Sequence, residues 1–181
     1  GQILNAVEDA PTSDVLILPN NPNIITTAQQ AVTLTSKNLS VVPASTISEG
    51  IEAITQFDAS GSIGSNLKNM CTSLDQISSL EICRATRSVE LGGVDVRDNQ
   101  IIALLNHQLI GAGDTAESVL IDSLTQIITH ETELVTLFWG DPMTADATAV
   151  LIQDLETRFN GVEFESTFGG QPHYHFLVSI Q

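Results

Sequence analysis

Short apolar runs alternate with helix-like spacing in the first part of the chain. Residues 14–19 (DVLILP) and 39–43 (LSVVP) form largely apolar runs, which are typical of short strands buried on both faces. Apolar residues then recur every three or four positions, as along one face of a helix, around residues 24–32, 50–54 and 63–74. This strand–helix–strand–helix order predicts a parallel sheet with right-handed crossovers.

The pattern changes after about residue 77. Residues 80–89, 100–110 and 134–139 have the composition of strands, with a turn predicted at Asn106-His107, and helical faces run through 116–127 and 147–159. Residues 162–168 and 174–180 are predicted to be the last two strands, joined as a hairpin by the five residues 169–173. We therefore expect a parallel α/β lobe over residues 1–77 and an α+β lobe over residues 78–181, packed together as one structural unit.

Composition narrows the function classes. The chain has 22 Asp and Glu but only 6 Lys and Arg, a formal charge of -16, although only 15% of its residues are charged. Bare nucleic acid and anionic membrane surfaces are therefore poor partners, and a hydrophobic content of 42% argues against disorder. Residues 98–181 hold 12 acids and a single base, Arg158, so the acidity is concentrated there.

Neither a membrane-spanning segment nor a secretory signal is predicted. No stretch approaches the roughly 18 consecutive apolar residues of a membrane span, and no basic region followed by an apolar run suggests a secretory signal. Cys71 and Cys83 are too few for a disulfide framework, so we expect two buried thiols in a cytoplasmic protein, with a single disulfide left open.

Two loops at predicted strand ends are candidate anion-binding sites. Parallel α/β sheets place ligands where a strand ends and a helix begins, and free backbone N–H groups there favour a phosphate or carboxylate. The alternative for both loops is simple helix capping, with Asn21 and Pro22 starting one helix and Thr46 and Glu49 forming a capping box. The candidate residues are Asn20, Asn21, Asn23, Ser45 and Thr46.

A third candidate is the glycine-rich connection before the last strand. Gly169 and Gly170 permit a close backbone approach, Gln171 offers a neutral amide, and Pro172 follows; an ordinary turn is an equally good interpretation. Arg84, Arg87 and Arg97 hold half of the basic charge, and they either bind a substrate carboxylate or neutralise neighbouring acids.

Sequence motifs for catalysis or metal binding are missing. Neither a dinucleotide-binding glycine motif nor a Walker A sequence occurs, and no G-x-S-x-G marks a nucleophilic serine. His173 and His175 are two positions apart and are expected to share a strand face, but surface or packed histidines are the default and no metal site is predicted. No catalytic residue is therefore proposed.

Taken in order, four stretches carry a family resemblance. LPNNPNI, VVPASTISEGI, ELVTLFWGD and GGQPHYHFLVSI together resemble the C-terminal region of the fatty acid kinase large subunit, formerly called dihydroxyacetone-kinase-like or DAK phosphatase proteins. The likeness covers almost the whole chain. It implies a DegV-like α/β fold, with a parallel-sheet strand–helix lobe followed by an α+β lobe of mixed or antiparallel strands.

The same resemblance implies that ATP and the fatty acid are bound by different domains or subunits. In that family Mg-ATP binds a separate N-terminal kinase domain, so no cofactor is expected in this chain. A DegV-family acyl-binding subunit presents the fatty acid that is phosphorylated, so the implied partners are a fatty acid or acyl phosphate together with that subunit. This sequence departs from the family where Gly1-Gln2 replaces a longer glycine-rich stretch and where Ser88, after the matching Arg87, replaces an acidic residue.

The leading hypothesis is a non-catalytic, partner-docking region of a bacterial fatty acid kinase. Its site would be one cleft at the strand ends. The rival hypothesis is a domain that binds a fatty acid or small carboxylate in its own right, and the oligomeric state, including a homodimer, stays open. The residues expected to line the cleft are Asn20, Asn21, Asn23, Ser45, Thr46, Arg87, Gly169, Gly170, Gln171 and Pro172.

Overall fold

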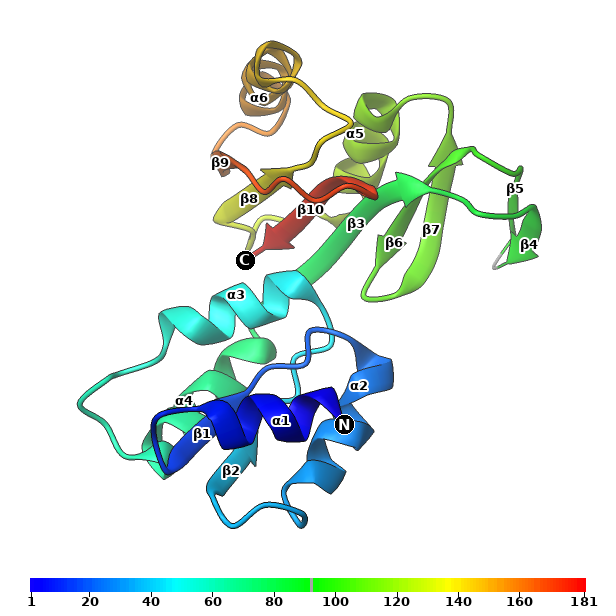
Figure 1. Cartoon of the computed structure of the whole chain (residues 1–181). Helices are drawn as coiled ribbons and strands as arrows, with labels where there is room; N and C mark the ends of the chain where they lie inside the picture. The colour runs from blue at the N-terminus through cyan, green and yellow to red at the C-terminus, as the bar shows by residue number, and fades with distance from the viewer. Residues whose placement is uncertain (92) are drawn as a thin grey trace. The chain divides into compact units, whose positions relative to one another are not determined.

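The computed structural model describes residues 1–91 and 93–181, which form two compact units (Figure 1). Unit 1 is Gly1–Ile77 and unit 2 is Ser78–Gln181, and each is described by itself. In the described part of the chain, no helix is both long enough and apolar enough to cross a membrane.

Unit 1 is built on two parallel strands. β1 (Asp14–Ile17) pairs with β2 (Asn38–Val41) in register, with Val15 opposite Leu39, and the sheet has only these two strands. Four helices accompany them, and the sequence pattern predicted the last three. They are α1 (Gln2–Asp9), α2 (Pro22–Ala31), α3 (Ile47–Thr55) and α4 (Ile63–Leu74).

Each face of this small sheet is covered. Side chains alternate along a strand, so Val15 and Ile17 pack with α1 and α2, whereas Leu16 and Leu18 pack with α3 and α4. The first face has Val7, Ala31 and Leu39 at its core, and the second has Val42, Ala53 and Met70. Helices on both faces of a parallel sheet explain why the strands are apolar runs without polar alternation.

Unit 2 is built on one six-stranded sheet. Its order is β7-β6-β3-β10-β8-β9, and every neighbouring pair is antiparallel except β8 and β9. β4 and β5 form a separate two-stranded hairpin. The strands are β3 (Ser78–Arg84), β4 (Val89–Leu91), β5 (Val94–Val96), β6 (Ile101–Leu105), β7 (Gln108–Gly113), β8 (Leu134–Trp139), β9 (Glu163–Phe168) and β10 (Tyr174–Ile180).

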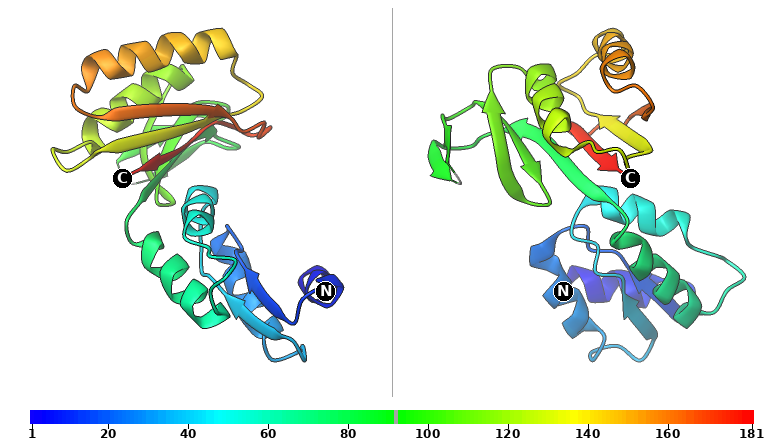
Figure 2. Two further views of the ribbon diagram at one scale, coloured as in Figure 1. Left: turned by 90° about the vertical axis from the view of Figure 1, so that its left-hand side faces the viewer. Right: turned by 180° about the vertical axis from the view of Figure 1, so that it is seen from behind.

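The two helices of unit 2 pack against one face of its sheet. α5 (Ala116–Ile127) joins β7 to β8, and α6 (Ala145–Arg158) joins β8 to the parallel strand β9 (Figures 1 and 2). Their apolar residues share one cluster with alternate residues of the central strands, including Leu120, Leu155 and Phe176. The expected combination of a strand–helix parallel lobe and an α+β lobe of mixed strands is confirmed.

Two strand predictions for unit 2 need correction. The expected hairpin between the last two strands is wrong, because β8 lies between β9 and β10, so residues 169–173 pass over the end of β8. The single expected strand over 80–89 ends at Arg84, and its last residue instead begins β4. The Asn106-His107 turn is confirmed, since both residues have positive φ, as a tight antiparallel turn requires.

Candidate functional site

The asparagine loop follows β1 and starts α2. Asn21 is the N-cap of α2, and its side chain accepts a hydrogen bond from the Asn23 N–H at 2.9 Å, with Pro22 in the first helical turn. The capping interpretation of Asn21 is therefore confirmed, while the Asn21 and Asn23 side chains remain exposed. Whether either also contacts a ligand or partner stays a prediction.

Asn20 lies against α3, the helix that begins after the Ser45-Thr46 loop. It has a left-handed backbone, with φ 52°, and its Oδ1 is buried without a hydrogen-bond partner among the described residues. A Cβ added to Gly50 in α3 would lie 2.1 Å from that oxygen, so only glycine permits this approach. The helical pattern marked Gly50 as part of an apolar stripe, but it gave no signal of this contact.

The Ser45-Thr46 loop is held by its own carboxylate. Thr46 caps α3 by accepting a hydrogen bond from the Glu49 N–H at 3.1 Å, and the Glu49 side chain closes the reciprocal capping box. The Ser45 N–H and Oγ also donate to the Glu49 carboxylate, the Oγ at 3.0 Å. The N-terminus of α3 thus already holds a negatively charged group, which is the ligand that its free N–H groups favour.

In unit 2 the glycine-rich loop is tied to the end of β8. The Gln171 Nε2 donates to the Phe138 carbonyl at 2.6 Å, and the Gly169 N–H donates to the Trp139 carbonyl at 2.9 Å. Gly170 has φ 67°, which favours glycine. The amide of Gln171 is therefore used to fasten the crossover, and Pro172 follows it, exposed.

The same crossover depends on Gly140, which the sequence reasoning missed. A Cβ there would lie 2.1 Å from the Tyr174 carbonyl oxygen and 2.4 Å from that of Gln171. The available signal was a glycine directly after a buried strand, next to Trp139. The Trp139 ring packs against Phe168 with centroids 4.5 Å apart, and Phe168 remains 55% exposed, an apolar surface at the edge of the sheet.

The arginines lie in different surroundings. Arg87 is exposed in the connection between β3 and β4, whereas Arg84 donates to the Asn99 carbonyl at 3.1 Å. Arg97 lines a shallow hollow of about 230 Å³ together with Asp98 and Asp114, which favours its role as a neutralising charge. The predicted site residues thus fall into two groups, one in each unit, and a single cleft formed by both groups stays a prediction.

Titratable side chains on β3 and β10 favour their uncharged forms. Burial raises the pKa of Glu81, although His107 partly opposes this, and burial followed by the nearby Glu81 charge raises the pKa of Cys83 to about 11. Burial also raises the pKa of Tyr174. A thiol that stays protonated at neutral pH is a poor nucleophile, so this cluster does not have the chemistry of a nucleophilic site.

The two histidines near the C-terminus do not share a strand face. His173 is exposed in the loop before β10, whereas His175 is buried in the strand beside a register shift, so the expectation from their spacing is wrong. Burial lowers the pKa of His175. Among the described residues, no three His, Cys, Asp or Glu side chains converge as metal ligands would.

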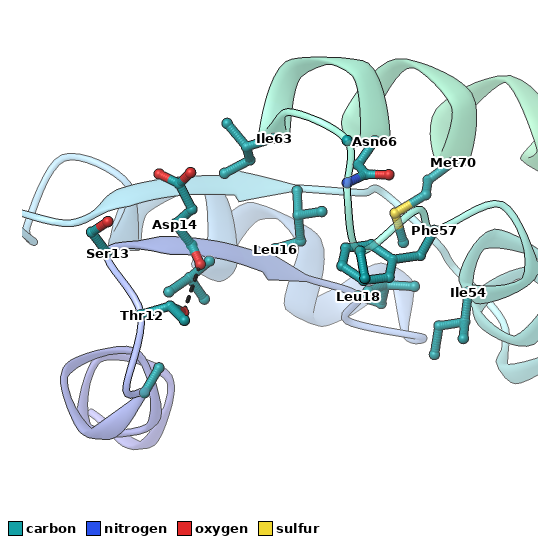
Figure 3. Close-up of a pocket in the computed structure, with 14 residues that line it drawn as sticks. Thr12, Ser13, Asp14, Leu16, Leu18, Ile54, Phe57, Ile63, Asn66 and Met70 are labelled. Atoms are coloured by element: carbon teal, nitrogen blue, oxygen red, sulfur yellow. Dashed lines mark hydrogen bonds between the residues drawn. The ribbon is translucent and has the colours of Figure 1, made fainter.

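Unit 1 contains a cavity that the sequence did not reveal. It has a volume of about 720 Å³ and runs along β1, and Figure 3 shows Leu16, Leu18, Phe57 and Met70 turned toward it. Its size lies in the range of small-molecule sites. Asp14 is the one charged side chain among the described residues that line it.

The comparison with known families decides the identity of the chain. All of residues 1–181 match the FakA-like C-terminal family, which is described as the C-terminal part of proteins like the A component of fatty acid kinase. The chain belongs to this family. Among curated proteins, it is 28% identical to Protein YloV of Bacillus subtilis (strain 168) over 179 residues, which are 99% of this chain and 32% of YloV. An uncharacterized protein of Staphylococcus haemolyticus (strain JCSC1435) shows the same identity and coverage, so the chain spans about a third of the length of these relatives.

Solved structures of the same fold are DegV-family proteins. A DegV family protein from Corynebacterium glutamicum has a TM-score of 0.62 at 12% identity, covering 99% of this chain and 78% of the other. The Streptococcus pneumoniae Fatty Acid Kinase (Fak) B3 protein, loaded with linoleic acid, has a TM-score of 0.60 at 9% identity, covering 98% and 73%. This FakA-like C-terminal region therefore has the DegV fold.

Proposed function

We propose that this chain is the non-catalytic docking region of a bacterial fatty acid kinase large subunit, and that it binds the acyl-carrying DegV-family subunit. The match of the whole chain to the FakA-like C-terminal family carries the proposal. In this proposal Mg-ATP binds elsewhere in the large subunit, and these residues position the partner that presents the acyl group.

The distribution of charge indicates what the partner surface should be like. Residues 98–181 carry 12 acids and one base, and that base, Arg158, donates to Asp154 at 2.7 Å. Exposed Glu163 and Glu165 lie on β9, the edge strand of the sheet, and Phe168 ends the same strand as an exposed apolar group. A basic surface with an apolar centre would complement this edge, and such charges mainly accelerate association.

Direct binding between purified proteins tests the proposal. The 181-residue chain is immobilised, and the DegV-family subunit of the same organism, loaded with fatty acid, is passed over it at several salt concentrations. We expect a saturable complex at micromolar concentrations, with an association rate that falls as salt screens the charges. Absence of binding at these concentrations would contradict the proposal.

Two substitutions test the predicted site in both units. Asn23→Ala removes an exposed amide in unit 1, and Arg87→Ala removes an exposed guanidinium in unit 2. If both groups line the docking surface, each substitution weakens the complex several-fold. Arg158→Ala is the charge-matched control, because it removes the same positive charge from an arginine that is engaged with Asp154 within its own helix, and it should not weaken the complex.

A fatty-acid-binding domain in its own right is the second candidate. The 720 Å³ cavity of unit 1 supports it, since Leu16, Leu18, Phe57 and Met70 line it. Asp14 in that lining speaks against it, because its charge would repel a fatty carboxylate and no described lining residue is basic. Native mass spectrometry after gentle purification separates the two: a retained acyl chain supports this candidate, and an empty protein supports docking.

A further inference from the structure

The outer edge of β1 has no neighbouring strand. The Asn38 N–H donates to the Ser13 carbonyl and the Val42 N–H donates to the Ile17 carbonyl, both at 2.9 Å, so the odd-numbered residues of this segment face β2. Backbone groups alternate in direction along a strand, so those of Asp14, Leu16 and Leu18 face the opposite edge. Among residues 1–91 and 93–181 the sheet consists of β1 and β2 alone, so it ends at this edge.

The cavity lies along this edge. Asp14, Leu16 and Leu18 form one wall, and Ile54 and Phe57, from the end of α3 and the loop after it, contribute to another (Figure 3). Ile54 is 60% exposed and Phe57 is 51% exposed, which is unusual for two large apolar side chains beside a strand edge.

The wall that carries Phe57 is fixed in place. The Asp58 N–H donates to the Asn66 Oδ1, and the Asn66 Nδ2 donates to the Asp58 carbonyl, both at 2.8 Å. Asn66 is itself buried in α4. The loop is therefore tied to α4, and the cavity lies between it and β1.

We propose that a further β-strand, supplied by the same polypeptide outside these 181 residues, fills this cavity and pairs with β1. A strand supplies donors and acceptors for the free backbone groups of Leu16 and Leu18, and its side chains cover Ile54 and Phe57. A hydrocarbon chain in the same place would bury those polar groups without hydrogen-bond partners, which is unfavourable.

Two observations identify the source of the strand. The matched relatives are about three times as long as this chain, which covers 32% of them, and it covers 72–78% of the DegV-family chains with the same fold. These related proteins therefore contain residues, outside the region that matches this chain, that can supply such a strand. A second copy is disfavoured, because pairing at this edge would bring together two chains of charge -16, each with Asp14 at the contact.

Hydrogen exchange at four neighbouring amides tests the proposal. The endogenous polypeptide is purified at its native length, its intact mass is measured, and its exchange is compared with that of the 181-residue chain. We expect a longer native polypeptide in which the Leu16 and Leu18 amides exchange at least about 100-fold more slowly than in the 181-residue chain. Val15 and Ile17 face β2 in both, so their rates should change much less.

A pair of substitutions gives a second readout. Phe57→Ser should leave the midpoint of thermal unfolding of the 181-residue chain almost unchanged, because Phe57 is half exposed there, but should lower that of the longer polypeptide by about 3 °C or more. Leu34→Ser is the control, since Leu34 is 68% exposed in the same unit and does not line the cavity. Leu34→Ser should change the midpoint of thermal unfolding by the same amount in both polypeptides.

Three results of these experiments would overturn the proposal, and a fourth would come from the native protein itself. They are a native polypeptide that is no longer than 181 residues, equal exchange of the Leu16 amide in both polypeptides, and equal effects of Phe57→Ser in both. Electron density or cross-links that place a small apolar molecule in the cavity of the native protein would also overturn it, in favour of a ligand site.

Discussion

The two units use apolar residues in different ways. Unit 1 divides its core between the two faces of a two-stranded sheet, with three fully buried residues at the centre of each cluster. Unit 2 has one continuous cluster, drawn from α5, α6 and the strands β3, β6, β8, β9 and β10. A sheet of two strands gives little independent stability, whereas a six-stranded sheet with a covering helical layer can form a core of its own.

This difference indicates which unit offers a surface that another segment could cover. Unit 1 has an open strand edge, a cavity and large apolar side chains at its surface, all of which suit a surface completed by another segment. Unit 2 has a continuous core, and most of its acids lie on its helices, its loops and the edge strand β9. We therefore expect unit 2 to unfold at the higher denaturant concentration, with unit 1 as the weaker part of the molecule.

The largest effect is expected from matched truncations of the two cores. Phe176 is fully buried in unit 2 and Met70 is 1% exposed in unit 1. Phe176→Ala should lower the free energy of unfolding of unit 2 by about 3–5 kcal/mol, and Met70→Ala should destabilise unit 1 by about 2–4 kcal/mol. Denaturant titration followed by Trp139 fluorescence, which reports unit 2, and by far-UV circular dichroism measures both. If both variants shift one common transition equally, the units do not unfold separately.

Two glycines test how rigidly each unit packs its loops. In unit 2, a Cβ on Gly140 meets the backbone oxygens of Tyr174 and Gln171, which cannot move away without breaking the crossover. Gly140→Ala should therefore cost about 3 kcal/mol. In unit 1, the three atoms nearest to a Cβ on Gly50 all belong to the Asn20 side chain, so Gly50→Ala should cost about 1 kcal/mol.

A second substitution makes this comparison sharper. Asn20→Gly removes the obstructing amide and keeps the positive φ of that position, so adding it to Gly50→Ala should restore most of the lost stability. Thermal unfolding of the single and double variants measures the coupling. A double variant that is no more stable than Gly50→Ala would show that the contact with Asn20 is not the cause.

Local patterns predicted much of unit 1 and less of unit 2. The apolar runs, the Asn21 and Thr46 caps and the helix that begins after Ser62 are all encoded in neighbouring residues, and the structure has them. The passage of residues 169–173 over β8 depends on which strands pair across long distances, and nothing within those five residues reports it. Gly-Gly is compatible with a hairpin and with a crossover alike.

The candidate site was likewise predicted only in part from the sequence. Sequence reasoning found the residues at the strand ends and the Thr46–Glu49 capping box, but it could not show that the Glu49 carboxylate would also accept hydrogen bonds from Ser45 or that Gln171 would fasten the loop to Phe138. Sequence reasoning could not predict the cavity, because nothing in the sequence shows that Leu16 and Phe57 line the same space.

Helix caps provide a smaller comparison between the units. Thr46 is buried and forms a reciprocal capping box with Glu49, whereas Thr144 is exposed and caps α6 through a single hydrogen bond to the Ala147 N–H at 3.3 Å. Thr46→Ala should cost about 1.5 kcal/mol and Thr144→Ala about 0.5 kcal/mol. Urea titrations give both values. A larger loss for Thr144→Ala would mean that burial and reciprocity do not strengthen the cap of unit 1.

The smallest effect concerns a buried carboxyl that only unit 2 has. Burial raises the pKa of Glu81 in the folded protein, while in the unfolded chain the group titrates near pH 4.3. The folded state then binds more protons than the unfolded state in the interval between the two values. The stability that Glu81 supplies is therefore fully present below about pH 4.3 and is lost as pH rises through the raised folded pKa.

Glu81→Gln removes this loss, because the amide stays neutral at every pH. The variant should be slightly more stable than the wild type at pH 7, and the advantage should shrink to nothing as the pH falls toward 4. Urea titrations at several pH values measure it. Glu163→Gln, at an exposed position on β9, serves as the control and should show no such pH-dependent gain. An advantage of Glu81→Gln that grows at lower pH would contradict the assignment, because it would mean that the folded protein holds Glu81 as a stabilised anion.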